Sequence, residues 1–198
     1  MKSCRRGFTL VETLVGLALF GLVSGVILAV FLMSHRYSRL YRQVSDAHRE
    51  TVSCMQGISR EVMRAHNQTV QAAVNATWFL SSKPVETNPG EVEFDPSSGQ
   101  LLWHKWLGIW CDSQGEVKVS ELPLSGGSRP FLSVDLTSEP TSISPFIAQS
   151  RQRRLGASIV SLQFTKDAHL VRVNMTSVTS TAGNPNTRYQ LSSSFSTQ

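Results

Sequence analysis

The sequence has no proline before Pro84 and no charged side chain from Thr13 to Ser34. Because proline breaks helices, its absence allows this part of the chain to form one long helix. The uncharged run is about as long as the roughly 20 apolar residues with which a helix crosses a bilayer. These two absences predict a long N-terminal helix whose first half can span a membrane.

Catalytic sequence motifs are also missing. The chain has no Gly-x-Ser-x-Gly, no His-Glu-x-x-His, no phosphate-binding glycine loop with its lysine and no dinucleotide fingerprint. It also lacks the Cys-x-x-Cys or closely spaced Cys and His residues that hold a structural metal. The histidines are scattered, and we interpret them as surface or structural residues. We therefore expect no enzyme, no catalytic residue, no cofactor and no metal.

Basic residues precede the apolar run. Lys2, Arg5 and Arg6 lie there without an acid among them. Such flanks stay cytoplasmic, so the chain beyond Met33 should lie outside the cytoplasm. A secretory signal would place small residues after a shorter apolar core, whereas here Gly7 precedes the run. A cut at Gly7 would remove the basic leader and keep the helix.

Glu12 is an acidic residue at the start of this apolar segment. Burying a carboxylate in hydrocarbon costs several kcal/mol unless it is paired or near an interface. Two explanations stay open. The carboxylate lies near the cytoplasmic headgroups, or it pairs with the cationic amine that cleavage would create at Phe8 of an adjacent copy. The second explanation would set the axial stagger between packed helices.

The segment Gly7-Phe8-Thr9-Leu10-Val11-Glu12 resembles the leader junction of the type IV pilin-like proteins, which reads Gly-Phe-Thr-Leu-x-Glu. The resemblance implies cleavage between Gly7 and Phe8 by a prepilin peptidase and N-methylation of Phe8. It also implies assembly through Glu12 into a helical filament drawn from the inner membrane. Beyond the start of the helix, the chain is similar to the family by architecture alone.

The layout resembles a minor subunit, either the J-type minor pseudopilin of type II secretion systems or the W-type minor pilin of type IV pili. The chain lacks the acidic, tryptophan-bearing segments of the J type and the Arg-Asn ending frequent in the W type, so the system stays open. Retention of Glu12 argues against the K-type tip subunit. The implied partners are other pilin or pseudopilin subunits, the prepilin peptidase, the inner-membrane assembly platform and lipid around the N-terminal helix.

We expect an α+β fold in which the long helix packs on an antiparallel β-rich domain. The predicted segments are the leader (1–7), the transmembrane and assembly half of the helix (8–34), its amphipathic half (35–74) and a β-rich periplasmic domain (75–198). The protein would span the bacterial inner membrane once, with its N-terminus cytoplasmic, and then enter the filament. Three-and-four spacing predicts a buried helix face. Its residues are Tyr37, Tyr41, Val44, Ala47, Thr51, Met55, Ile58, Val62 and Ala65.

Short alternating apolar runs after Asn75 predict strands. The predicted strands are 77–80, 91–94, 101–106, 116–122, 131–136, 158–165, 170–176 and 188–195. Turn residues at 95–99 predict a hairpin between the second and third of these, and 166–169 should turn the chain between the sixth and seventh. Trp103, Trp106 and Trp110 are interpreted first as core residues and alternatively as an exposed edge for a partner.

Two further features carry alternatives. Cys54 and Cys111 are the two cysteines that remain after removal of the leader. They form a candidate disulfide in an oxidising compartment, with two separate thiols as the alternative. Arg151, Arg153 and Arg154 are interpreted as a solvated loop, or otherwise as an anion or partner contact. The second would suit a competence or adhesion pilin that binds DNA or a surface through its globular domain. Removal of the leader lowers the formal charge of +5 by three to +2, so we do not expect nucleic-acid binding.

Overall fold

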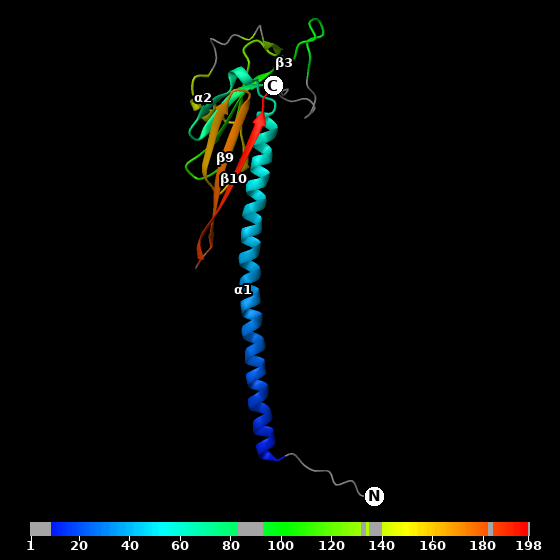
Figure 1. Ribbon diagram of the computed structural model, residues 1–198, viewed down its shortest axis with the longest axis vertical. Coiled ribbons are helices and arrows are strands. Elements are labelled where there is room, and N and C mark those ends of the chain that lie inside the picture. Colours follow the sequence, from blue (N-terminus) through cyan, green and yellow to red (C-terminus); the bar gives the residue numbers. More distant parts are fainter. Residues whose placement is uncertain (1–8, 83–92, 132–133, 135–139, 182–183, 198) are drawn as a thin grey trace. The chain divides into compact units, whose positions relative to one another are not determined.

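The computed structural model describes residues 9–82, 93–131, 134, 140–181 and 184–197. The chain forms two compact units, residues 1–44 and residues 45–198. The first unit contains the N-terminal part of helix α1 (Leu10–Val62), and the second contains its C-terminal part and the strands (Figure 1). One long apolar helix followed by antiparallel strands confirms the predicted α+β fold.

Helix α1 ends earlier than predicted, at Val62 and not near residue 74. After it come the short 3-10 helix η1 (Asn67–Thr69) and strand β1 (Gln71–Ala73). The backbone leaves the helix because it bonds to a neighbouring strand instead. The His66 N–H donates to the Leu80 carbonyl at 2.9 Å, and the Leu80 N–H donates to Thr69 Oγ1 at 3.0 Å. These bonds replace those of another helical turn.

The largest sheet has five antiparallel strands in the order β1-β2-β4-β5-β7. Strands β8, β9 and β10 form a second antiparallel sheet in the order β10-β9-β8, and β3 pairs with β6. The bounds are β2 Ala76–Ser81, β3 Leu102–Trp103, β4 Lys105–Cys111, β5 Val117–Pro123, β6 Arg129–Pro130, β7 Gln152–Gly156, β8 Ile159–Asp167, β9 Leu170–Thr181 and β10 Asn184–Ser196. A short helix, α2 (Ser144–Ile147), precedes β7.

The strand predictions hold best where a run alternates and a turn bounds it. Strands β2, β5, β8, β9 and β10 confirm the predicted runs near 77–80, 116–122, 158–165, 170–176 and 188–195. The predicted run at 101–106 is wrong in its bounds, since it divides at His104 and β4 continues to Cys111. Phe94 and Leu101 form an isolated bridge around the predicted turn at 95–99. Residues 91–92 and most of 131–136 lie outside the described residues.

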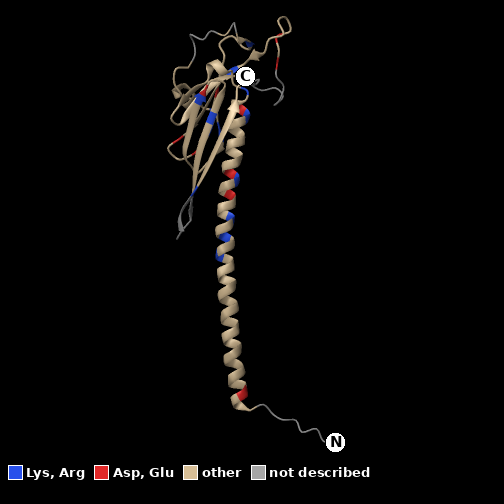
Figure 2. Ribbon diagram, in the orientation of Figure 1, with Lys and Arg blue, Asp and Glu red and all other residues tan. Residues whose placement is uncertain are grey.

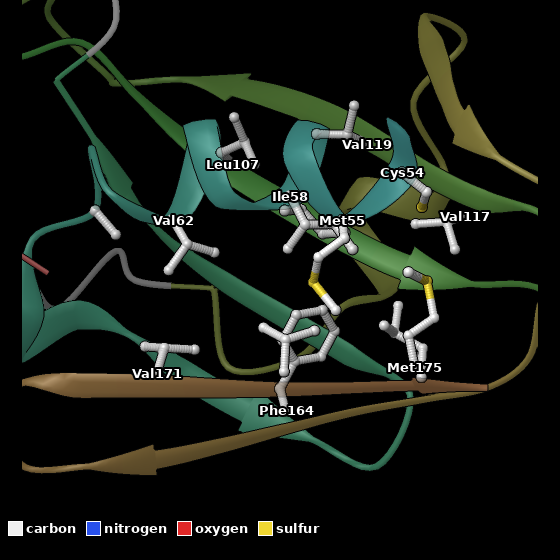
Figure 3. Packing of buried hydrophobic residues seen from close by; sticks show 14 of the residues in the cluster. Cys54, Met55, Ile58, Val62, Leu107, Val117, Val119, Phe164, Val171 and Met175 are labelled. Atoms are coloured by element: carbon white, nitrogen blue, oxygen red, sulfur yellow. The ribbon is translucent and has the colours of Figure 1, made fainter. Parts of the chain in front are cut away.

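The main core lies between α1 and the two larger sheets (Figure 3). The buried face of α1 begins with Thr51 and includes Cys54, Met55, Ile58 and Val62. Side chains of a strand alternate between its faces, and Leu107 and Ile109 of β4 point into this cluster. Strands β8 and β9 contribute Leu162, Phe164, Val171, Val173 and Met175.

The N-terminal end of the predicted helix stripe is wrong. Tyr37 and Tyr41 are 70% and 77% exposed, so they are not core residues. Val44 and Ala47 are partly buried, and full burial begins at Thr51. The predicted spacing of the stripe is correct. Periodicity alone, however, does not show how far along the helix the sheets that cover it extend.

The tryptophans form a second core with residues around α2. Trp78, Trp103, Trp106 and Trp110 are all buried there, together with Phe146 of α2. Trp78 Nε1 donates to the Pro140 carbonyl at 2.7 Å, which satisfies its polar atom. The predicted core interpretation of the tryptophans is therefore confirmed in this structure.

A first prediction concerns the contribution of α1 to the fold. A fragment that begins at Tyr37 should unfold cooperatively in urea, whereas one that begins at Asn75 should aggregate or stay disordered. The reason is that the shorter fragment lacks Cys54, Met55, Ile58 and Val62, which cover the apolar sides of the strands. Circular dichroism during urea titration measures the difference.

Two substitutions on α1 control for general effects of sequence change. In the fragment from Tyr37, Ile58→Ala should lower the free energy of unfolding by about 2–5 kcal/mol because the side chain is fully buried. Gln56→Ala on the exposed side should change it by less than about 0.5 kcal/mol. Equal stability of the two fragments would show that the helix does not form part of the core.

Candidate functional site

The N-terminus of α1 is closed by Thr9 and Glu12. The Thr9 N–H donates to Glu12 Oε2 at 2.9 Å, and the Glu12 N–H donates to Thr9 Oγ1 at 3.3 Å. The Thr9 hydroxyl also donates to Glu12 Oε2, at 3.1 Å. This reciprocal arrangement is a capping box, which satisfies backbone N–H groups that have no partner within a helix. Glu12 therefore has a role within its own chain.

Sequence reasoning missed this role of Thr9, although its signal is present. A threonine followed three residues later by glutamate, directly before an apolar run, is the usual signature of a capping box. The Thr9-x-x-Glu12 spacing matches that signature. The predicted cleavage residues Gly7 and Phe8 lie outside the described residues, so cleavage and N-methylation stay predictions.

The segment of α1 from Leu10 to Met33 presents its large apolar side chains to the surroundings. Among its exposed residues are Leu10, Leu17, Phe20, Ile27 and Phe31. The helix is long and apolar enough to cross a membrane by length and composition. A single helix of this kind suits either a bilayer or the helices of neighbouring subunits, because both offer apolar contact all around it.

The two cysteines lie at the same end of the main core. Cys54 is fully buried on α1, and Cys111, at the end of β4, packs against the same cluster. Both are free thiols in the structure. Burial raises the pKa of Cys54 to about 12, with smaller contributions from Cys111 and Glu50. Burial, followed by Asp112, also raises the pKa of Cys111. The disulfide stays a prediction.

The arginine cluster at 151–154 is not the predicted loop, because residues 152–156 form strand β7 at the edge of the five-stranded sheet. Arg153 Nη2 pairs with Glu61 Oε1 of α1 at 2.8 Å, and Arg154 Nη1 pairs with Glu116 Oε1 at 3.1 Å. The side chains of Arg153 and Arg154 thus form ion pairs with two different carboxylates. The cluster offers less positive charge to DNA than its sequence indicates.

A cavity of about 560 Å³ lies beside β7, and Arg151 and Arg153 line it. Lys105 lines the same cavity with 1% of its surface exposed, and its Nζ pairs with Glu121 Oε2 at 2.6 Å. An anionic group of a partner would meet the cluster here. That contact stays a prediction, since Lys105 and Arg153 already pair with the carboxylates of Glu121 and Glu61.

Charged groups around the turn between β4 and β5 form a further network. Lys118 Nζ lies 2.6 Å from Asp112 Oδ2 and 3.2 Å from Glu116 Oε2. The hydrogen bond from Lys118 lowers the pKa of Asp112, and the bonds from Arg154 and Lys118 lower the pKa of Glu116. These groups bind each other around this turn and resemble a structural network, not an acid and base pair.

His66 packs between two other aromatic rings. His66 stacks on Phe131, with ring centroids 3.6 Å apart, and meets the edge of Trp103 at 4.9 Å. Burial, with a smaller effect of Lys166, lowers the pKa of His66, which favours the neutral ring. Across the described ranges, no group of three or more His, Cys, Asp or Glu side chains is arranged to hold a metal ion.

Comparison with protein families gives one finding that bears on these features. A family model described as the prokaryotic N-terminal methylation motif matches residues 2–32. The match supports a type IV pilin-like subunit. It covers the basic residues before the helix, the capping box and nearly all of the apolar segment, and it fits a membrane-anchored single-pass protein. Members of this family are structural subunits and not enzymes. Comparison with curated proteins and with solved structures gives no match.

A second prediction concerns Cys54 and Cys111. In protein recovered from an oxidising compartment, intact-mass measurement should show the loss of two hydrogens, restored by reductant. Without the bond, the raised pKa of Cys54 should make the reduced domain lose stability as pH rises from about 9 to about 12, because unfolding releases a thiol that ionises more easily. Complete alkylation of both thiols in unfolded, unreduced protein would contradict the disulfide.

Proposed function

We propose that this protein is a minor pilin or pseudopilin subunit of an inner-membrane filament that drives type II secretion or type IV pilus assembly. The observation that carries the proposal is the methylation-motif match over residues 2–32, with Glu12 at the capped start of the apolar helix. In this proposal the globular domain lies in the periplasm. Other pilin-like subunits, the prepilin peptidase and the inner-membrane assembly platform are its partners.

The capping box explains how Glu12 is tolerated at the start of an apolar segment. Unpaired backbone N–H groups are costly in lipid, and a helix N-terminus carries partial positive charge. The Glu12 carboxylate accepts a hydrogen bond from the Thr9 N–H and faces this partial positive charge. These two interactions offset part of the cost of placing a carboxylate here. Cleavage after Gly7 would place a cationic amine at Phe8, one residue before the cap. The same carboxylate is then near a new cation at the same helix end.

Glu12 would therefore act within and between subunits. Within a chain it caps α1 through Thr9. Between chains its charge would pair with the Phe8 amine of a neighbour and align the two helices along their axes. The remaining binding energy would come from burying the apolar side chains of residues 10–33 against other helices, and specificity from the globular faces.

A third prediction tests processing. Mass spectrometry of membrane-extracted protein should identify an N-methylated Phe8 as the first residue. Gly7→Leu should block cleavage, because the peptidase must approach an extended backbone that carries no side chain at this position. Gly16→Ala is the matched control, since an added methyl group there meets no atom within 4 Å. Recovery of the intact chain from cells with active prepilin peptidase would refute the proposed function.

A fourth prediction separates the two roles of Glu12. Glu12→Val loses both the charge and the cap, whereas Glu12→Gln keeps an oxygen that can accept the Thr9 N–H. Thr9→Val removes the hydroxyl and keeps the carboxylate. If charge pairing aligns the subunits, both Glu12 variants should enter filaments at least about tenfold less, a loss of about 1.4 kcal/mol. Thr9→Val should assemble nearly as well as the parent.

Filament incorporation is measured by immunoblotting of sheared or purified filaments against the membrane pool. All three variants should insert into the membrane, and Glu12→Val should insert at least as well because it removes a charge. Normal assembly of Glu12→Gln together with reduced assembly of Glu12→Val would show that capping matters and charge pairing does not. Normal assembly of both Glu12 variants would exclude either role in assembly.

A further inference from the structure

Three arginines come shortly after the apolar segment of α1. Arg36, Arg39 and Arg42 are exposed, and the chain has no acidic residue between Glu12 and Asp46. In the described part of the chain, none of the three has a carboxylate within ion-pair distance. Figure 2 shows the long uncharged part of α1 ending at these basic residues. We name Arg36, Arg39 and Arg42 the arginine stripe.

The arginine stripe occupies one side of the helix. Successive residues of an α-helix turn by about 100°, so a spacing of three places these arginines within an arc of about 120°. Tyr37 and Tyr41 are exposed on the same two turns. Tyrosine has an apolar ring and a polar hydroxyl, and it is enriched where a membrane meets water. Cationic and interfacial side chains are therefore combined directly after the apolar segment.

The arginine stripe also lies at the right depth for lipid headgroups. At a rise of about 1.5 Å per residue, the three Cα atoms lie about 4.5, 9 and 13.5 Å beyond Met33 along the axis. The headgroup layer of a bilayer is about 5–7 Å thick on each side. Helical side chains lean toward the helix N-terminus, which here is toward the apolar segment. Long arginine side chains can thus reach back to phosphate groups.

Charge around the segment favours an anionic partner for the arginine stripe. The leader carries three basic residues, Lys2, Arg5 and Arg6, and the arginine stripe carries the same number on the opposite side of the segment. Basic residues on the far side oppose the orientation that the leader favours, because they too tend to stay cytoplasmic. Removal of the leader would leave the stripe as the nearest cationic flank. A stabilising anionic contact would offset this cost.

We propose that the arginine stripe is a binding site for anionic phospholipid headgroups. Guanidinium groups bind phosphate through paired hydrogen bonds, and basic residues near a membrane surface are attracted to anionic lipid. The site would hold the end of α1 at the surface until the subunit is extracted. The inference rests on the proposed membrane anchoring. It goes beyond that function because it assigns a lipid class and the residues that select it.

The test uses the chain recovered after cleavage at Gly7, because Lys2, Arg5 and Arg6 would also attract anionic lipid. The protein is purified in detergent and incubated with an equimolar mixture of phosphatidylglycerol and phosphatidylcholine. Native mass spectrometry then counts the lipids of each kind that stay bound. We expect a preference for phosphatidylglycerol of about tenfold or more, which weakens as salt is added. The triple variant R36Q/R39Q/R42Q should bind the two lipids equally, and R36K/R39K/R42K should keep a preference.

The matched control is R60Q/R172Q/R188Q, which removes the same charge from exposed arginines elsewhere. It should keep the preference of the parent. Equal binding of the two lipids by the parent, or equal loss in the control, would overturn the proposal. If R36Q/R39Q/R42Q kept the lipid preference but lost other subunits on purification, the stripe would instead bind an acidic protein face, which also overturns it.

Failure of the proposed function is distinguishable from failure of this inference. Release of the parent chain from membranes by alkaline carbonate, together with an uncleaved leader, would refute the anchored subunit. A chain that is cleaved at Phe8 and resists carbonate, yet shows no preference for phosphatidylglycerol, would refute the lipid site alone.

Discussion

The folded domain depends on the burial of one face of α1 against two sheets. Cys54, Met55, Ile58 and Val62 lie three or four residues apart, and each is buried. Burying apolar surface stabilises the fold roughly in proportion to area. Neither larger sheet could keep its inner residues from water without this helix, since both contribute side chains to the same cluster. The domain therefore includes the end of the helix as part of its core.

Polar contacts then determine how the helix sits on the strands. Glu50 Oε1 accepts the Ala157 N–H at 3.0 Å, and Thr51 Oγ1 bonds to Ser177 Oγ at 2.8 Å. At the C-terminal end of α1, Glu61 is 4% exposed and pairs with Arg153. Apolar contact alone permits sliding and rotation, whereas a buried polar atom without its partner is costly. These contacts select one register of the helix against the sheets.

The same helix serves different surroundings at its two ends. Within residues 10–33 the only polar side chains are Glu12, Thr13 and Ser24, so this segment is almost entirely apolar. The charged groups lie at its two ends, at Glu12 and in the arginine stripe. Thr9 and Glu12 satisfy the backbone at the start. This division fits a membrane-anchored, pilin-like subunit, whose apolar segment needs apolar surroundings and whose domain folds around the other end of the helix.

The sequence by itself determined the features that depend on local chemistry. The uncharged run, the absent proline and the Thr9-x-x-Glu12 spacing specify where α1 begins and what surrounds it, because caps and hydrophobic length need no distant residue. Only the tertiary structure decided that α1 ends at Val62, that Tyr37 and Tyr41 are exposed, and that Arg153 and Arg154 join different ion pairs. Each of these depends on contacts between residues far apart in the chain, and a pattern of neighbours carries no record of such contacts.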